Sequence, residues 1–289
     1  MDQFTTQDVS VIVCTKNSIN AIRSCLLSLR AAGVGQLIVV DAASTDGTNE
    51  IAAELADLVL SDPGTGLGNA RNIGIKETTR SLILNMGSDN ILPDGQLEKM
   101  ITYLENGYFH GVAAQTRIAG DDFCSRGLNA WRAGRFNEGD RAVIGTPTLF
   151  IGDLLREKPY DPSRKFSDDS ELCERWAKEF GARFAISDAY VLEVGKTSWE
   201  EVWIRAKMYG TSDHEIFAKN RSQWSFLRKV KSLSHPMHSD FFTPLRHLPP
   251  VEAASNIPFL SAFTALRYAG WIASSLAKLN DINSTGNLN

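Results

Sequence analysis

The feature that most constrains this fold is a regular alternation of strand-like and helix-like runs over the first 118 residues. Five short apolar, β-branched runs are separated by segments with helical spacing, and they cover residues 9–14, 36–41, 58–61, 81–86 and 111–118. Strict alternation with short loops is typical of parallel sheets covered by helices. The sequence therefore predicts an α/β domain with a doubly wound, mostly parallel sheet and helices on both faces.

The alternation ends after residue 118. The patterns that follow predict a strand over 145–150, a helix over 167–181, strand material over 182–195 and a helix over 198–210. Residues 216–234 and 256–279 again have a helical pattern, and a proline-bearing connection separates them. We therefore expect a helical extension behind the α/β domain.

Composition narrows the function classes. The chain has 289 residues and a net charge of −4, which argues against general nucleic-acid binding, so we expect no nucleic-acid partner. Residues 216–248 are the exception, because six basic residues stand there against one acid, Asp240. Such a local patch indicates an anionic surface or ligand. Cysteines without paired spacing, no signal-peptide pattern and no long apolar run predict a cytoplasmic protein without a membrane span.

Polar residues follow three of the predicted parallel strands. They are residues 15–17 (TKN), Asp41 and residues 87–89 (GSD). Ligands of open α/β sheets bind at the carboxyl ends of the strands. We therefore expect these three clusters to meet at one edge of the sheet and to form a binding site.

Five motifs in this order resemble those of the family-2 glycosyltransferases, which have the GT-A fold. They are VSVIVCTKN, VVDAASTDGT, GNARNIGI, MGSDNILPD and FSDDSELCERW, and together they place the resemblance over residues 9 to 210. The resemblance implies an inverting transferase that takes a sugar from a nucleotide-diphosphate sugar. It also implies that the donor contacts come from Thr15, Asn17, Asp41, Arg71, Ser88 and Asp89.

The same resemblance assigns the acids of the last motif. Asp169 occupies the place of the base that removes the acceptor proton, and Asp168 and Glu171 occupy places near the acceptor. Acids at the start of a helix are also ordinary partners of the helix dipole, and one acid can serve in both ways.

A Mg²⁺ or Mn²⁺ ion is implied by the Asp-x-Asp motif of the family. Asp89 aligns with its second acid, whereas Gly87 stands where the first acid would be. Glu193 lies near the end of a predicted strand, where many relatives carry a histidine, and we interpret it either as a further metal ligand or as an ordinary strand glutamate. Asp89 itself has the alternative of capping the helix that begins near Pro93.

The resemblance divides the chain into a catalytic domain over 1–215, with a nucleotide-binding half (1–118) and an acceptor-binding half (119–215). A helical extension over 216–279 and a disordered tail over 280–289 follow. Residues 220–279 mix apolar, aromatic and basic side chains. They fit either a membrane surface at the inner face of the cell membrane or packing, on the domain or in a homodimer.

Three hypotheses remain open on the sequence. The first is sugar transfer to a hydroxyl of a glycan or of a polyprenyl-linked acceptor in surface polysaccharide synthesis. The second is transfer to a polyprenyl phosphate, which is already anionic and needs no base. The third is a non-catalytic protein that binds a nucleotide sugar, and the glycine at position 87 keeps this alternative open.

Overall fold

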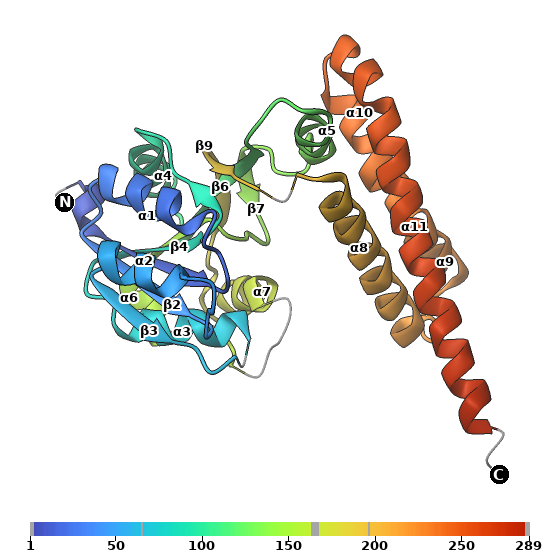
Figure 1. Ribbon diagram of the computed structural model, residues 1–289, viewed down its shortest axis with the longest axis horizontal. Coiled ribbons are helices and arrows are strands. Elements are labelled where there is room, and N and C mark those ends of the chain that lie inside the picture. The colour runs from blue at the N-terminus through green and yellow to red at the C-terminus, as the bar shows by residue number, and fades with distance from the viewer. Residues whose placement is uncertain (1–2, 65, 163–167, 196, 287–289) are drawn as a thin grey trace. The chain divides into compact units, whose positions relative to one another are not determined.

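The structure is a computed structural model that describes residues 3–64, 66–162, 168–195 and 197–286 (Figure 1). The chain divides into two compact units. The first comprises Met1–Arg117 and Asn137–Gly195, and the second comprises Ile118–Phe136 and Lys196–Asn289. The predicted boundary at residue 215 is therefore not where the structure divides, because the helix that begins at Trp199 belongs to the second unit.

One mixed sheet forms the centre of the first unit. Its strand order among the described residues is β3-β2-β1-β4-β8-β6-β9-β5, with β7 paired to β9. The strands are β1 (Val9–Thr15), β2 (Gln36–Asp41), β3 (Leu58–Ser61), β4 (Leu82–Gly87), β5 (Asn90–Ile91), β6 (Gly111–Ile118), β7 (Gly139–Arg141), β8 (Thr148–Ile151) and β9 (Phe184–Glu193).

The α/β class is confirmed, but the parallel part of the sheet is smaller than the sequence predicts. Strands β3, β2, β1 and β4 pair in parallel. Strand β8 runs antiparallel to both β4 and β6, and β9 runs antiparallel to β5 and β7. The segment at 111–118 is a strand as predicted, yet it pairs with the later strand β8. Local periodicity reports which residues are buried and not which partner runs beside them.

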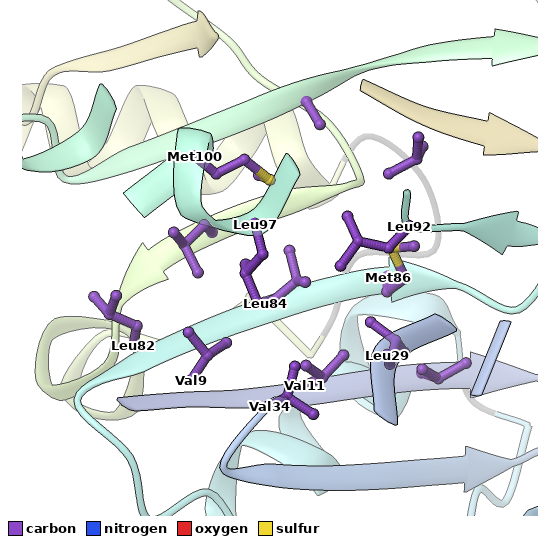
Figure 2. Close-up of a cluster of buried hydrophobic side chains, with 14 of the residues drawn as sticks. Val9, Val11, Leu29, Val34, Leu82, Leu84, Met86, Leu92, Leu97 and Met100 are labelled. Atoms are coloured by element: carbon purple, nitrogen blue, oxygen red, sulfur yellow. The ribbon is translucent and has the colours of Figure 1, made fainter. Parts of the chain in front are cut away.

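Helices cover both faces of this sheet. One face packs on α1 (Ile22–Ala31), α2 (Thr48–Leu55) and α4 (Gln96–Asn106), and the other on α3 (Leu67–Lys76), α6 (Gly152–Glu157) and α7 (Asp168–Phe180). Side chains of β1 alternate between the two cores, since Val9 and Val11 enter the first core and Ile12 enters the second. Figure 2 shows the first core around Leu84 of β4, with Leu97 and Met100 of α4 above it.

The second unit is helical. Its helices are α5 (Phe123–Arg132), α8 (Trp199–Asn220), α9 (Phe226–Pro236), the π-helix η2 (Met237–Phe242), α10 (Thr243–His247) and α11 (Pro250–Gly286). Figure 1 shows α8 and α11 running side by side. Glycines permit this approach, because a Cβ added to Gly210 of α8 would lie 1.8 Å from the carbonyl oxygen of Arg267. Helix α5 supplies Leu128 and Trp131 to the core of this unit, where Phe259 and Phe263 of α11 meet them.

A buried ionic cluster fixes η2 inside the second unit. Asp240 is fully buried and accepts hydrogen bonds from Trp131 Nε1 at 3.0 Å and from Arg267 Nη1 at 3.0 Å. Arg135 also binds Asp240, and Asp213 of α8 binds the other side of Arg267 at 2.7 Å. Paired charges of this kind hold a segment in one place, because losing one partner would leave the other charge buried and uncompensated.

Two expectations about the C-terminal part can be compared with the structure. Helix α11 continues to Gly286, so helix replaces most of the disordered tail predicted over 280–289, and residues 287–289 lie outside the described residues. Within the described residues, no helix combines the length and the apolar character that crossing a membrane requires.

Candidate functional site

The ends of the central parallel strands meet at one edge of the sheet, as the sequence predicts. Strand β1 lies between β2 and β4. Thr15 is in register with Asp41, and Cys14 is in register with Gly87. The polar residues that follow these strands are therefore neighbours, although they are far apart in the sequence.

The loops after β1 and β2 are tied together by hydrogen bonds around Asp41. Ser44 donates to the Asp41 carboxylate through its hydroxyl and, at 2.9 Å, through its amide. The Asn17 amide donates to Ser44 Oγ at 2.8 Å, and Asn17 Oδ1 accepts from the Thr45 amide at 3.0 Å. Asp41 is 3% exposed, so its buried carboxylate fixes the loop that carries Ser44. It also remains a candidate contact for the sugar donor.

Thr15 is a second polar group at the same edge. Its side chain is buried, and its hydroxyl oxygen has no hydrogen-bond partner among the described residues. An unsatisfied buried hydroxyl costs free energy, so such a group is a reason to expect a ligand or a water there.

The turn after β4 shows why a glycine stands at position 87. A Cβ built on Gly87 would lie 2.4 Å from Asn90 Nδ2 and 3.0 Å from Asp89 Oδ1. Asn90 is 6% exposed and thus takes the space where the first acid of an Asp-x-Asp motif would begin. Ser88, the residue between Gly87 and Asp89, has its Oγ 3.0 Å from Ser18 Oγ, in the loop after β1.

Asp89 and Glu193 lie on neighbouring backbone segments. Asn90 is in register with Glu193 in the β5–β9 pair, and the Val194 amide donates to the Asp89 carbonyl oxygen at 2.8 Å. Glu193 is 8% exposed. In the part of the chain that the structure describes, no three His, Cys, Asp or Glu side chains gather closely enough to hold a metal ion by themselves. Mg²⁺ commonly takes only one or two carboxylates and completes its shell with substrate phosphates, so the donor set of Asp89 and Glu193 fits such an ion.

A partly buried acid pair, bound by a buried arginine, lies at the start of α7. Arg71 Nη1 donates to Asp168 Oδ2 at 2.8 Å and to Asp169 Oδ1 at 2.8 Å, and Arg71 Nη2 donates to the Thr146 hydroxyl. The side chains are 5%, 13% and 25% exposed for Arg71, Asp168 and Asp169, so Asp169 is the most open of the three. Gly68 in the first turn of α3 leaves room for this contact, since a Cβ there would lie 3.2 Å from Asp168 Cβ.

Tyr160 completes the surroundings of the pair. Its hydroxyl donates to Asp169 Oδ1 at 3.4 Å and accepts from Asn85 Nδ2 at 3.0 Å. The Arg71 guanidinium carbon lies 5.1 Å from the centre of the tyrosine ring. Burial raises the pKa of the Tyr160 phenol above its usual range, so the phenol stays protonated as a donor.

Burial also raises the pKa of Asp169 above that of an ordinary carboxyl group. The positive charge of Arg71 opposes this shift, whereas the negative charge of Asp168 adds to it. A carboxylate with a raised pKa is a stronger base than a solvated one. The site thus contains one acid that can accept a proton and a cation that keeps it ionised.

Two of the sequence-predicted residues form ion pairs with other side chains. Arg71, which the resemblance assigns to the donor, binds the acid pair. Glu171, expected near the acceptor, forms an i,i+4 pair with Arg175, whose Nε lies 2.7 Å from Glu171 Oε1. Sequence reasoning missed Tyr160, Asn85 and Thr146, because no motif spacing connects them to the acids.

Comparisons with known proteins show what the chain as a whole is similar to. The model of a family described as Glycosyl transferase family 2 matches residues 10–188. The glycosyltransferase AglJ of Haloferax volcanii is 26% identical over 144 residues, which are 50% of this chain and 45% of that protein. The match thus spans less than half of that relative's length.

Solved structures show the same fold. S. aureus TarS 1-349 in complex with UDP has a TM-score of 0.51 at 18% identity, covering 94% of this chain and 91% of that chain. The same TarS fragment in complex with UDP-GlcNAc has a TM-score of 0.51 at 17% identity, covering 94% and 92%. At these identities the likeness extends to the GT-A architecture alone.

Proposed function

This chain belongs to glycosyl transferase family 2, and from that premise we propose that it moves a sugar from a nucleotide-diphosphate sugar to a hydroxyl group of a glycan or lipid-linked acceptor. The observation that carries the proposal is the partly buried pair of Asp168 and Asp169, which is bound by Arg71 and of which Asp169 is 25% exposed. We place the reaction in surface polysaccharide synthesis, on the cytoplasmic side of the cell membrane.

Asp169 is the proposed base. An acceptor hydroxyl within hydrogen-bond reach of its carboxylate would give up its proton as the oxygen attacks the anomeric carbon of the donor. The nucleotide diphosphate leaves from the opposite side, so the configuration at that carbon is inverted. Arg71 keeps the carboxylate ionised before the attack, and Tyr160 fixes its orientation. Asp168 lies next to the base and is the proposed contact for the acceptor, with Glu171 one turn further along α7.

The donor is proposed to bind at the edge of the sheet formed by the ends of β1, β2 and β4. Thr15 offers a buried hydroxyl without a partner among the described residues, and Asn17, Asp41 and Ser88 line the loops on either side of it. Nucleotides bind at this edge of α/β sheets because the polar loops converge there.

Asp89 and Glu193 are the proposed ligands of a Mg²⁺ or Mn²⁺ ion. When bound, such an ion neutralises the charge that develops on the departing diphosphate. The chain's own contribution is to bring the backbone segments that carry the two residues next to each other, through the β5–β9 pairing and the Val194–Asp89 backbone hydrogen bond.

Calorimetric titration of UDP, GDP and dTDP, each with and without Mn²⁺, tests the donor site. One nucleotide is expected to bind with metal, and Asp89→Ala and Glu193→Gln are expected to lose that binding. Asp153→Ala is the matched control, because Asp153 is a carboxylate of the same unit that is 95% exposed. If no nucleotide binds to the folded protein under any condition, the proposed function is wrong. Metal-independent binding that survives in both variants would remove the metal from the proposal.

A further inference from the structure

Helix α9 exposes a continuous apolar stripe. We define the α9 stripe as Phe226, Leu227, Val230 and Leu233 of α9 together with Met237, the first residue of η2, whose exposed fractions are 77%, 78%, 46%, 42% and 40%. Residues 226, 230, 233 and 237 follow one another at intervals of four, three and four, which places them on one face of a helix. Large apolar side chains gathered on one exposed face mark an interaction surface.

The α9 stripe is more exposed than the rest of its helix. Pro236 of α9 is buried and Lys229 and Ser232 are half-buried, whereas each residue of the stripe is at least 40% exposed. The Tyr268 hydroxyl donates to the Leu233 carbonyl oxygen at 2.8 Å, and η2, which follows α9 directly, is fixed through buried Asp240. The helix is therefore held in place while its apolar face stays uncovered by the described residues of its own unit.

The charge around the α9 stripe has one sign. Residues 216–239 contain no Asp or Glu, and they contain five basic residues: Lys219, Arg221, Arg228, Lys229 and Lys231. An apolar helix face flanked by basic side chains is the pattern of helices that lie in the interface of an anionic bilayer. A protein that bound this surface would need a groove that is apolar inside and acidic at its edges. An anionic bilayer has both an apolar interior and negatively charged head groups.

An apolar groove adjoins the α9 stripe. A cavity of about 560 Å³ is lined by Met237 and Phe241 of η2 and by Ala265, Tyr268, Ala269 and Ile272 of α11, together with two hydroxyl residues, Ser261 and Thr264. Met237 belongs to both the groove and the stripe. A space of this size, mainly apolar and open at one side, accommodates a single hydrocarbon chain.

We propose that the α9 stripe binds the surface of an anionic lipid bilayer and that the adjoining groove takes up one acyl chain of a bilayer lipid. The inference deepens the proposed function, because a lipid-linked acceptor is presented at such a surface. Binding to the bilayer itself does not depend on the proposed function; only the reason for that binding rests on it. Vesicle binding and nucleotide binding are measured separately, so either proposal can fail while the other stands.

Flotation with vesicles tests the α9 stripe. The full chain is expected to bind vesicles of phosphatidylcholine mixed with phosphatidylglycerol about tenfold or more tightly than vesicles of phosphatidylcholine alone. The double variant Phe226→Ser/Leu227→Ser should weaken the binding by about tenfold or more for each side chain that no longer enters the interface. Val251→Ser is the matched control, since Val251 is 82% exposed in the same unit but lies on α11.

Charge and groove variants complete the test. Arg228→Glu/Lys231→Glu, at exposed sites of α9, should lower binding to the anionic vesicles by roughly fivefold per residue, whereas Lys76→Glu/Lys178→Glu, at exposed sites of the first unit, should change it little. Ala265→Trp, which fills the groove, should also weaken binding, and an unchanged affinity would overturn the part of the proposal that concerns the groove. The proposal as a whole is overturned if the wild type does not float with anionic vesicles. It is equally overturned if light scattering shows a dimer that Phe226→Ser/Leu227→Ser dissociates, because a second copy would then cover the stripe.

Discussion

Arg71 holds Asp169 through a contact of 2.8 Å between Nη1 and Oδ1, and the same nitrogen reaches Asp168 at the same distance. The guanidinium is 5% exposed, so water screens this contact little. One cation thus compensates two neighbouring carboxylates, and the properties of Asp169 depend on Arg71 as much as on its own position at the start of α7.

Asp169→Asn should lower the rate of sugar transfer to a hydroxyl acceptor by about 10²–10⁴-fold, because an amide cannot accept the proton. Calorimetric binding of the donor nucleotide should be unchanged. Glu174→Gln is the control on the same helix, and it is expected to keep most of the activity because Glu174 is exposed and has no part in the proposed site. Full activity of Asp169→Asn would contradict the role of base and would favour a phosphate acceptor.

Arg71→Met should destabilise the fold by about 1–3 kcal/mol, because two partly buried carboxylates would remain without their buried cation. Urea denaturation followed by far-UV circular dichroism measures the effect. Arg23→Met is the comparison, since the Arg23–Glu54 pair is 47% and 57% exposed and its loss should move the midpoint little. Equal midpoints for the two variants would show that the buried pair is not important for stability.

The activity should fall on the acidic side at a higher pH than an ordinary aspartate would give, because burial raises the pKa of Asp169. The pH profile of kcat/KM measures this limb. In Arg71→Lys, whose ammonium cannot reproduce the contacts to both acids, the limb should move further toward neutral pH. A limb at the position of a solvated carboxyl group in both proteins would contradict the assignment.

The same shift predicts how stability depends on pH. The folded state favours protonated Asp169, so this residue's contribution is fully present below its unfolded pKa and is lost as the pH rises through the raised folded pKa. Asp169→Asn should therefore be at least as stable as the wild type at neutral pH, with the difference vanishing in acid. Thermal unfolding of both proteins between about pH 4 and pH 8 tests this. A variant that is less stable at neutral pH than in acid, relative to the wild type, would contradict it.

Gly87→Asp alone should destabilise the protein by about 1–3 kcal/mol, because its Cβ would lie 2.4 Å from Asn90 Nδ2. Combined with Asn90→Ser, which frees that space, the substitution should fold normally and bind the nucleotide more tightly in the presence of Mn²⁺. Asn90→Ser alone is the control for the effect of the freed space. If the double variant remains as unstable as Gly87→Asp, then Asn90 is not the obstacle.

The sequence predicts the helices and strands of the first unit well where the apolar pattern within a segment is enough to identify it. Strands are predicted over 9–14, 36–41 and 81–86, and the structure has them over 9–15, 36–41 and 82–87. The register of β1 with β2 and β4 confirms that their ends meet. Pairing direction was less accessible, because the antiparallel contacts of β8 and β9 depend on chain reversals that span tens of residues. The contacts of Arg71 with Asp168 and Asp169 are not predictable from the sequence for a similar reason, because these partners lie 97 and 98 residues further along the chain.

The division into units has a consequence for how the chain can be cut. Residues 118–136 belong to the second unit although they lie between two segments of the first. Leu128 and Trp131 of α5 are buried only because α8 and α11 cover them. A protein that ended at residue 195 would retain α5 without α8 and α11. The apolar face of α5 would then be exposed to water and would favour aggregation. The second unit is therefore built from two separate segments of the chain, and truncation at a single position cannot produce either unit intact.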